Sequence, residues 1–283
     1  MAELQTEILA EGFIFLEGPR WHAGCLWVSD MWDYKVIKVK PDGSRETVVE
    51  VPNRPSGLGF LPDGTPLVVS MGDRKLYRIA GGALVQHADL APCVTGDIND
   101  IVMDAEGRAY VGNFGCDLFA GEALKNADLV CVGRDGQVRK VASDLVFPNG
   151  MVIMDGGRTL VAAETFANRL TAFDRAADGS LSNRRAFAEL GQLTPDGICL
   201  DQAGGIWVAS FATDEFVRVE AGGTITDRVA VRERRAVACQ LGGADGRTLF
   251  CLTFEGHLDE IKARKRAGRV ETVKVAVPGA GSP

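Results

Sequence analysis

The chain has 283 residues, of which 46% are hydrophobic and 24% are charged, so it can bury a core without disulfides. Its formal net charge of −7 argues against a nucleic-acid partner, and the one dense basic stretch, residues 262–269, is best interpreted as a solvated segment. No apolar run approaches the roughly 20 residues of a membrane span, so we expect no membrane partner. The start of the chain does not resemble a signal peptide, and the seven cysteines include no CxxC pair. These features predict a cytoplasmic protein with buried, reduced thiols.

One unit recurs six times along the chain: a short apolar stretch, a polar turn that contains glycine, and a second apolar stretch. The six copies begin at Glu17, Ser56, Asn99, Asn149, Asp196 and Ala238. Each has a glycine seven or eight residues later, at Gly24, Gly64, Gly107, Gly157, Gly204 and Gly246. Glycine at this place supplies the positive φ of a tight hairpin turn. The spacing of 39 to 50 residues between copies is typical of a four-stranded propeller blade.

The stretches between the copies complete the blades. Hairpin patterns, with alternating apolar residues around Gly-containing turns, occupy residues 36–50, 129–143, 170–188 and 216–231. Residues 268–277 supply late strands of the sixth blade, and residues 6–13 add its last strand, so that the two ends of the chain close the ring. Helical patterns are confined to residues 121–127 and 258–267. We therefore predict an all-β fold, a single six-bladed β-propeller domain over residues 1–283.

The first residue of each copy leads into the innermost strand of its blade, so these residues form a ring around the central channel. Glu17, Asn99, Asn149 and Asp196 offer carboxylate and amide oxygens, which suit Ca²⁺, Mg²⁺ or Mn²⁺, and Zn²⁺ also accepts carboxylates. The alternative is that they are turn formers, because Asn-Gly, Asp-Gly and Ser-Gly are common turn dipeptides. Because Asp and Asn recur at the same position of several copies, a role as metal ligands remains open beside a role as turn formers.

Several motifs together resemble the gluconolactonase family, which includes regucalcin (senescence marker protein) and bacterial sugar-acid lactonases. They are LEGPRW, LPDGTPLVVS, INDIVMDAEGRAYVGN, FPNGM, PDGICLD and VPGAG, in this order over residues 15–281. The resemblance implies a six-bladed propeller that holds one divalent cation near the mouth of its channel. Ca²⁺ is the first expectation, and Zn²⁺, Mn²⁺ and Mg²⁺ remain open.

By position in those motifs, the resemblance implies that Glu17, Asn149 and Asp196 are the protein ligands of the cation. Asn99 corresponds to a residue that contacts substrate or approaches the metal. Animal members carry an arginine two residues before that asparagine, whereas this chain has Asp97, which we expect to contact a substrate hydroxyl. Phe147 enters the ring just before Asn149 and is a further candidate for the substrate pocket.

The activity that the resemblance implies is hydrolysis of a cyclic ester, a sugar-acid lactone such as gluconolactone. A cation would polarise the carbonyl and water would attack its carbon. Asp196 is the candidate general base, or it serves mainly as a ligand, since a cation favours its ionised form. Two alternatives stay open: another metal-dependent ester hydrolase on this scaffold, similar to paraoxonase, and a calcium-binding regulatory propeller without turnover. The sequence leaves the oligomeric state open.

Overall fold

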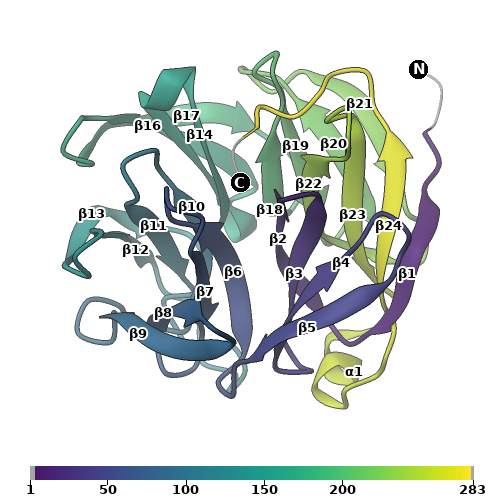
Figure 1. The fold of residues 1–283 in the computed structure, drawn as a ribbon. Helices are drawn as coiled ribbons and strands as arrows, with labels where there is room; N and C mark the ends of the chain where they lie inside the picture. The colour runs from purple at the N-terminus through teal and green to yellow at the C-terminus, as the bar shows by residue number, and fades with distance from the viewer. Residues whose placement is uncertain (1–3, 282–283) are drawn as a thin grey trace.

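The computed structural model describes residues 4–281, which form six four-stranded antiparallel sheets arranged as the blades of a β-propeller (Figure 1). The predicted fold class is therefore confirmed. The prediction of a single domain over residues 1–283 stays a prediction, and its ends, residues 1–3 and 282–283, lie outside the described residues.

The first three blades are built from consecutive strands. Blade one consists of β2 (Leu16–His22), β3 (Cys25–Asp30), β4 (Lys35–Val39) and β5 (Arg45–Glu50). Blade two consists of β6 (Pro55–Phe60), β7 (Pro66–Ser70), β8 (Lys75–Ala80) and β9 (Ala83–Asp89). Blade three consists of β10 (Ile98–Met103), β11 (Ala109–Asn113), β12 (Ala127–Val132) and β13 (Val138–Leu145).

Blades four and five are also built from consecutive strands, whereas blade six takes its outermost strand from the N-terminus. Blade four consists of β14 (Pro148–Met154), β15 (Thr159–Glu164), β16 (Arg169–Arg175) and β17 (Leu181–Glu189). Blade five consists of β18 (Pro195–Leu200), β19 (Ile206–Ser210), β20 (Glu215–Val219) and β21 (Ile225–Ala230). Blade six consists of β22 (Arg235–Gly242), β23 (Thr248–Phe254), β24 (Gly268–Lys274) and β1 (Glu7–Phe13).

The N-terminal strand closes the ring, as predicted. β1 pairs antiparallel with β24, with Glu7 opposite Thr272 and Phe13 opposite Gly268. Figure 1 shows the purple β1 alongside the yellow β24 at the edge of blade six. A strand from each end of the chain thus completes one sheet, which ties the first and last blades together.

The turns inside the six repeat copies have the predicted backbone. Their glycines all have positive φ: Gly24, Gly64, Gly107, Gly157, Gly204 and Gly246. The helical predictions fare less well. Residues 121–126 form no helix, because all six residues are exposed and provide no apolar stripe to bury. The second helix is only α1 (Leu258–Lys262), which ends just before Arg264 turns to a left-handed φ of 58°. Two short 3₁₀ turns, η1 (Asp155–Gly157) and η2 (Thr165–Ala167), flank β15.

The cysteines are the predicted reduced thiols, and most of them are buried. All seven cysteines are free, and five of them are buried, as predicted. Within residues 4–281, no helix has the length and apolar character needed to cross a membrane.

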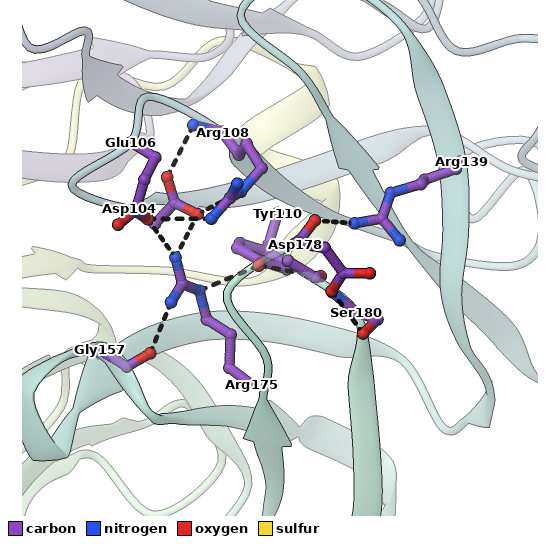
Figure 2. Close-up of polar contacts among 10 residues, drawn as sticks. Asp104, Glu106, Arg108, Tyr110, Arg139, Gly157, Arg175, Asp178 and Ser180 are labelled. Atoms are coloured by element: carbon purple, nitrogen blue, oxygen red, sulfur yellow. Dashed lines mark hydrogen bonds and ion pairs between the residues drawn. The ribbon is translucent and has the colours of Figure 1, made fainter.

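A network of ion pairs joins blades three and four (Figure 2). Arg175 on β16 donates to Asp104 Oδ2 at 2.5 Å, to the Tyr110 hydroxyl at 3.0 Å and to the Gly157 carbonyl at 2.6 Å. Arg108 donates to the same Asp104 oxygen at 2.7 Å. Burial alone would raise the pKa of Asp104, but the hydrogen bonds from Arg175 and Arg108 outweigh it and hold the pKa below its ordinary value. The buried Asp104 carboxylate thus forms ion pairs with two arginines.

Candidate functional site

The first two strands of each blade place two sets of residues at the same mouth of the channel. In blade four Pro148 pairs with Glu164, and in blade five Pro195 pairs with Ser210. The start of each innermost strand therefore lies beside the end of the next strand. The repeat heads form a floor at this mouth, and the loops that follow the second strands stand around it.

The repeat heads are buried and contact one another across blade boundaries. Ser56 Oγ donates to Asn99 Oδ1 at 2.8 Å, and Asn99 Nδ2 donates to Asn149 Oδ1 at 2.9 Å. Asn149 Nδ2 in turn donates to Thr165 Oγ1 at 3.3 Å. Residues that are 43 to 50 positions apart in the chain are thus joined in one chain of hydrogen bonds, as the shared register predicts.

In blades two to five, a bulge at the start of the innermost strand turns the head residue out of the regular ladder. In blade four the pairing register shifts between Pro148 and Met151, and blades two, three and five shift at the equivalent place. In blade one Glu17 stays paired with Ser29 and the shift follows it, whereas in blade six the shift precedes Ala238. A Cβ atom on Gly150 would lie 2.6 Å from the backbone nitrogen of Ile198 in the next blade. Neither Gly150 nor Gly197 has a positive φ. These glycines are therefore required by the close approach of innermost strands, and the turn interpretation of the X-Gly pairs is wrong for them.

Glu17 and Asp196 are the two carboxylates of the floor, and both are more than nine-tenths buried. Burial raises the pKa of Glu17 well above its ordinary value, and the neighbouring carboxylates of Asp196 and Asp100 raise it further. Burial is also the main cause of the raised pKa of Asp196, opposed by a hydrogen bond from Asn149. Asp196 Oδ1 has no hydrogen-bond partner among the described residues. Two buried carboxylates thus lie close together, and no lysine or arginine among residues 4–281 forms an ion pair with either.

The Arg20 guanidinium lowers the pKa of Glu17, but less than burial and the neighbouring carboxylates raise it, and it is already engaged elsewhere. Its guanidinium contacts Asp100 Oδ1 at 3.1 Å and also donates to the Ile101 carbonyl. Arg20 therefore neutralises Asp100 rather than the carboxylates of the floor.

The floor residues suit a hard divalent cation. Across residues 4–281 no three His, Cys, Asp or Glu side chains gather as a metal-binding group. The donors at the floor are instead two carboxylates, Glu17 and Asp196, with the amide oxygen of Asn149 beside them. That amide oxygen accepts one hydrogen bond and keeps a second lone pair. A bound cation would offset the repulsion between the carboxylates and occupy the unpartnered Asp196 Oδ1.

Above the floor lies an open cavity of about 370 Å³ whose wall is mostly apolar, with seven aromatic residues among those that line it. Four wall residues come one or two positions after the second strand of their blades: Trp32, Phe114, Phe166 and Phe211. Sequence reasoning missed these residues. Their recurrence at one place in four repeat copies was the signal that could have found them.

Phe147 and Asp97, the other two predicted substrate residues, occupy different places. Phe147 lines the cavity and stacks on Phe114, with the ring centroids 4.3 Å apart. Asp97 is not among the residues that line the cavity. It accepts a hydrogen bond from Arg54 at 2.5 Å, and the Arg54 guanidinium lies over the Phe119 ring at 4.5 Å. The expected contact of Asp97 with a substrate hydroxyl stays a prediction.

Comparison with known proteins identifies the family. Residues 15–255 match the family described as SMP-30/Gluconolactonase/LRE-like region. The chain belongs to this family. Among its relatives is pentonolactonase XacC of Haloferax volcanii, 28% identical over 251 residues, which cover 86% of this chain and 82% of that one. Another is 6-deoxy-6-sulfogluconolactonase of Pseudomonas putida, 25% identical over 100% of this chain and 99% of that one.

The solved structures agree on the fold. A calcium-binding protein, regucalcin, from Agrobacterium tumefaciens superposes with a TM-score of 0.83 at 24% identity, covering 100% of this chain and 99% of that one.

Proposed function

We propose that this protein is a lactone hydrolase that uses one divalent cation, Ca²⁺ foremost, held by Glu17, Asn149 and Asp196. The observation that carries the proposal is the pair of buried, mutually repelling carboxylates at the floor of an open cavity. Such an arrangement costs free energy unless it binds a cation, and perturbed carboxylates in a cleft are typical of functional sites. The names of the relatives support lactone chemistry and make sugar lactones the first substrates to test.

When bound, the cation supplies a Lewis acid that polarises the lactone carbonyl and stabilises its developing negative charge. The side chains of the floor orient the ester and handle the proton. Asn99 uses one amide hydrogen on Asn149, so its second N–H can be donated to an oxygen of the lactone.

Asp196 has the second role, as general base. A carboxylate has two oxygens, so it can hold a cation with one and accept a proton from the attacking water with the other. The water oxygen bonds to the carbonyl carbon, and the ring C–O bond then breaks. The proton passes to the released ring oxygen, which yields a hydroxy acid.

The test is an assay of lactone opening with and without metal. Purified protein is stripped with a chelator and then reloaded with Ca²⁺, Mn²⁺ or Zn²⁺, and acid release is followed with glucono-, galactono- and xylonolactone. We expect activity to vanish on stripping and return with one of the cations. Asp196→Ala should lower kcat/KM by about 10² to 10³, the scale seen when one group that stabilises the transition state is removed.

The matched control is Asp63→Ala, which removes an exposed carboxylate in the turn of blade two. It should leave kcat/KM unchanged. Full activity after complete metal removal would contradict the role of the cation, and metal binding without opening of any lactone would favour the regulatory alternative.

A further inference from the structure

The cavity wall offers little to a polyhydroxylated ligand and much to an apolar one. Its aromatic rings pack against one another in a continuous layer: Phe147 contacts Phe166 edge-to-face at 4.8 Å, and Trp32 contacts Phe119 in the same way at 5.4 Å. The volume of about 370 Å³ falls within the range of small-molecule sites. A wall of this kind gains affinity mainly by removing apolar ligand surface from water.

The rim of the cavity carries exposed apolar side chains beside two charged residues of α1, Asp259 and Lys262. Five large hydrophobic side chains are exposed within residues 4–281, and two of them, Phe166 and Leu258, line this cavity. They are 47% and 63% exposed and come from different blades, on η2 and at the start of α1. Exposed apolar side chains that gather around one concave site mark a place where an apolar ligand enters.

The neutral polar groups of the cavity are largely engaged within the chain, and the free N–H of Asn99 is assigned to the ester itself. Asn99 and Asn149 bond to each other, and Thr165 Oγ1 accepts from Asn149 and donates to the Pro195 carbonyl at 2.7 Å. Thr194 Oγ1 accepts from a backbone N–H at 2.8 Å. Sugar hydroxyls that lie below the rim, beside Phe114, Phe147 and Phe166, would therefore face aromatic carbon. Each hydroxyl buried without a partner lowers affinity on the order of tenfold.

We infer that the substrate is a lactone with an alkyl or aryl substituent on its ring, rather than a polyhydroxylated sugar lactone. This inference rests on the proposed function for the ring-opening step, which occurs at Glu17, Asn149 and Asp196. Beyond the proposed function, it specifies the kind of substituent on the lactone ring, which is selected by the wall around Phe114, Phe147 and Phe166. The apolar substituent lies against these rings while the ester carbonyl reaches the floor.

The experiment compares three lactones that share one five-membered ring. γ-Phenyl-γ-butyrolactone carries an apolar group, γ-butyrolactone carries none, and ribono-1,4-lactone carries hydroxyls. The kcat/KM of the Ca²⁺-loaded protein is divided by the rate constant of each lactone with hydroxide, which removes differences in intrinsic reactivity. We expect the phenyl lactone to exceed ribonolactone by at least about tenfold, the scale of a good apolar contact in a pocket. A higher normalised value for ribonolactone overturns the inference and leaves the proposed function intact.

Two rim variants test whether the wall makes this choice. Phe166→Ser and Leu258→Ser remove exposed side chains, so both variants should fold. Each should lower kcat/KM for the phenyl lactone about three- to tenfold more than it lowers the value for γ-butyrolactone. The control is Val85→Ser, which removes a 46% exposed side chain on β9, away from the cavity, and should change neither value. Equal losses for the two lactones in both rim variants contradict the inference.

A binding measurement separates the substrate class from the reaction. The lactam 5-phenyl-2-pyrrolidinone has the shape of the phenyl lactone but a ring bond that is far harder to hydrolyse. Calorimetry should show that it binds at least about tenfold more tightly than 2-pyrrolidinone. If no lactone is opened but this preference holds, the ligand class stands and the proposed hydrolysis fails. If the two lactams bind alike, the inference fails whatever the lactone assay shows.

Discussion

Asp104 and Asp196 are both buried aspartates near the ends of innermost strands, yet the chain treats them in opposite ways. Asp104 follows the far end of β10 and receives two arginines, Arg175 and Arg108, from which it accepts hydrogen bonds at 2.5 and 2.7 Å (Figure 2). Asp196 lies at the open mouth and leaves one carboxylate oxygen without a partner. The pKa of Asp104 is held below its ordinary value, whereas that of Asp196 is raised.

The difference separates a carboxylate that stabilises the fold from one that is kept for binding. Burial penalises the charge of both aspartates. Only Asp104, in the network between blades three and four, has arginines that compensate its charge. At the channel mouth the compensation is left to a ligand, which is the pattern expected where function is maintained at a cost in stability.

The largest expected effect comes from breaking the Asp104 network. Arg175→Met removes a guanidinium whose side chain is only 6% exposed, and the partner carboxylate is 1% exposed. The variant leaves a buried charge undercompensated, so the free energy of unfolding should fall by about 3 kcal/mol. Urea denaturation followed by tryptophan fluorescence measures it.

Arg185→Met is the matched control, because Arg185 pairs with Asp174 at the surface, where the two side chains are 42% and 51% exposed. Its effect should stay within about 0.5 kcal/mol. Equal losses in the two variants would show that burial of the Asp104 network contributes nothing.

A smaller effect of opposite sign is expected at the channel mouth. In the presence of a chelator, Asp196→Asn removes one of two repelling buried carboxylates, so the free energy of unfolding should rise by about 1 kcal/mol. Asp104→Asn removes a carboxylate that two arginines bind, so it should lower the same quantity by about 2 kcal/mol. Denaturation of both variants in one chelating buffer measures the contrast. If Asp196→Asn also destabilises the stripped protein, the carboxylate at the mouth is structural and the comparison fails.

The smallest effect is a pH dependence at Asp104. Because its pKa is lower in the folded protein than its ordinary value of 3.8, its stabilising contribution is complete above that value and is lost as pH falls through the folded pKa. The difference in unfolding free energy between the wild type and Asp104→Asn should therefore be constant from about pH 6 to 8 and should shrink below about pH 4. Urea titrations at a series of pH values measure it. A difference that grows on acidification would reverse the assigned sign.

The repeat made the blades and the floor predictable. A glycine seven or eight residues into each copy fixed the hairpin turns, and the shared register placed Glu17, Asn149 and Asp196 at equivalent starts of innermost strands. The closing strand was also predictable, since residues 6–13 lie outside the six repeat copies and the sixth blade needed a last strand to close the ring. These features depend on local periodicity, which a single sequence displays directly.

The cavity wall and the pairing of Asp97 were not predicted, for physical reasons that differ. Aromatic residues such as Phe114 and Phe166 usually mark core, and only the topology shows that their loops meet at one mouth. Asp97 and Arg54 are 43 residues apart in the chain and lie on neighbouring blades. No local sequence pattern therefore predicts their ion pair. The helix expected at residues 121–127 failed because propensity without a buried face does not hold a short helix in water.

The central claim is that the floor of the channel mouth binds one divalent cation through Glu17, Asn149 and Asp196. Calorimetric titration of chelator-stripped protein with Ca²⁺ tests it most directly, with Mn²⁺ and Zn²⁺ titrated in parallel. The account predicts one cation per chain, with affinity at least about tenfold lower in Glu17→Gln and in Asp196→Asn, since each variant removes a charged ligand. No binding of any of the three cations by the wild-type protein, or binding that both variants leave unchanged, would contradict it.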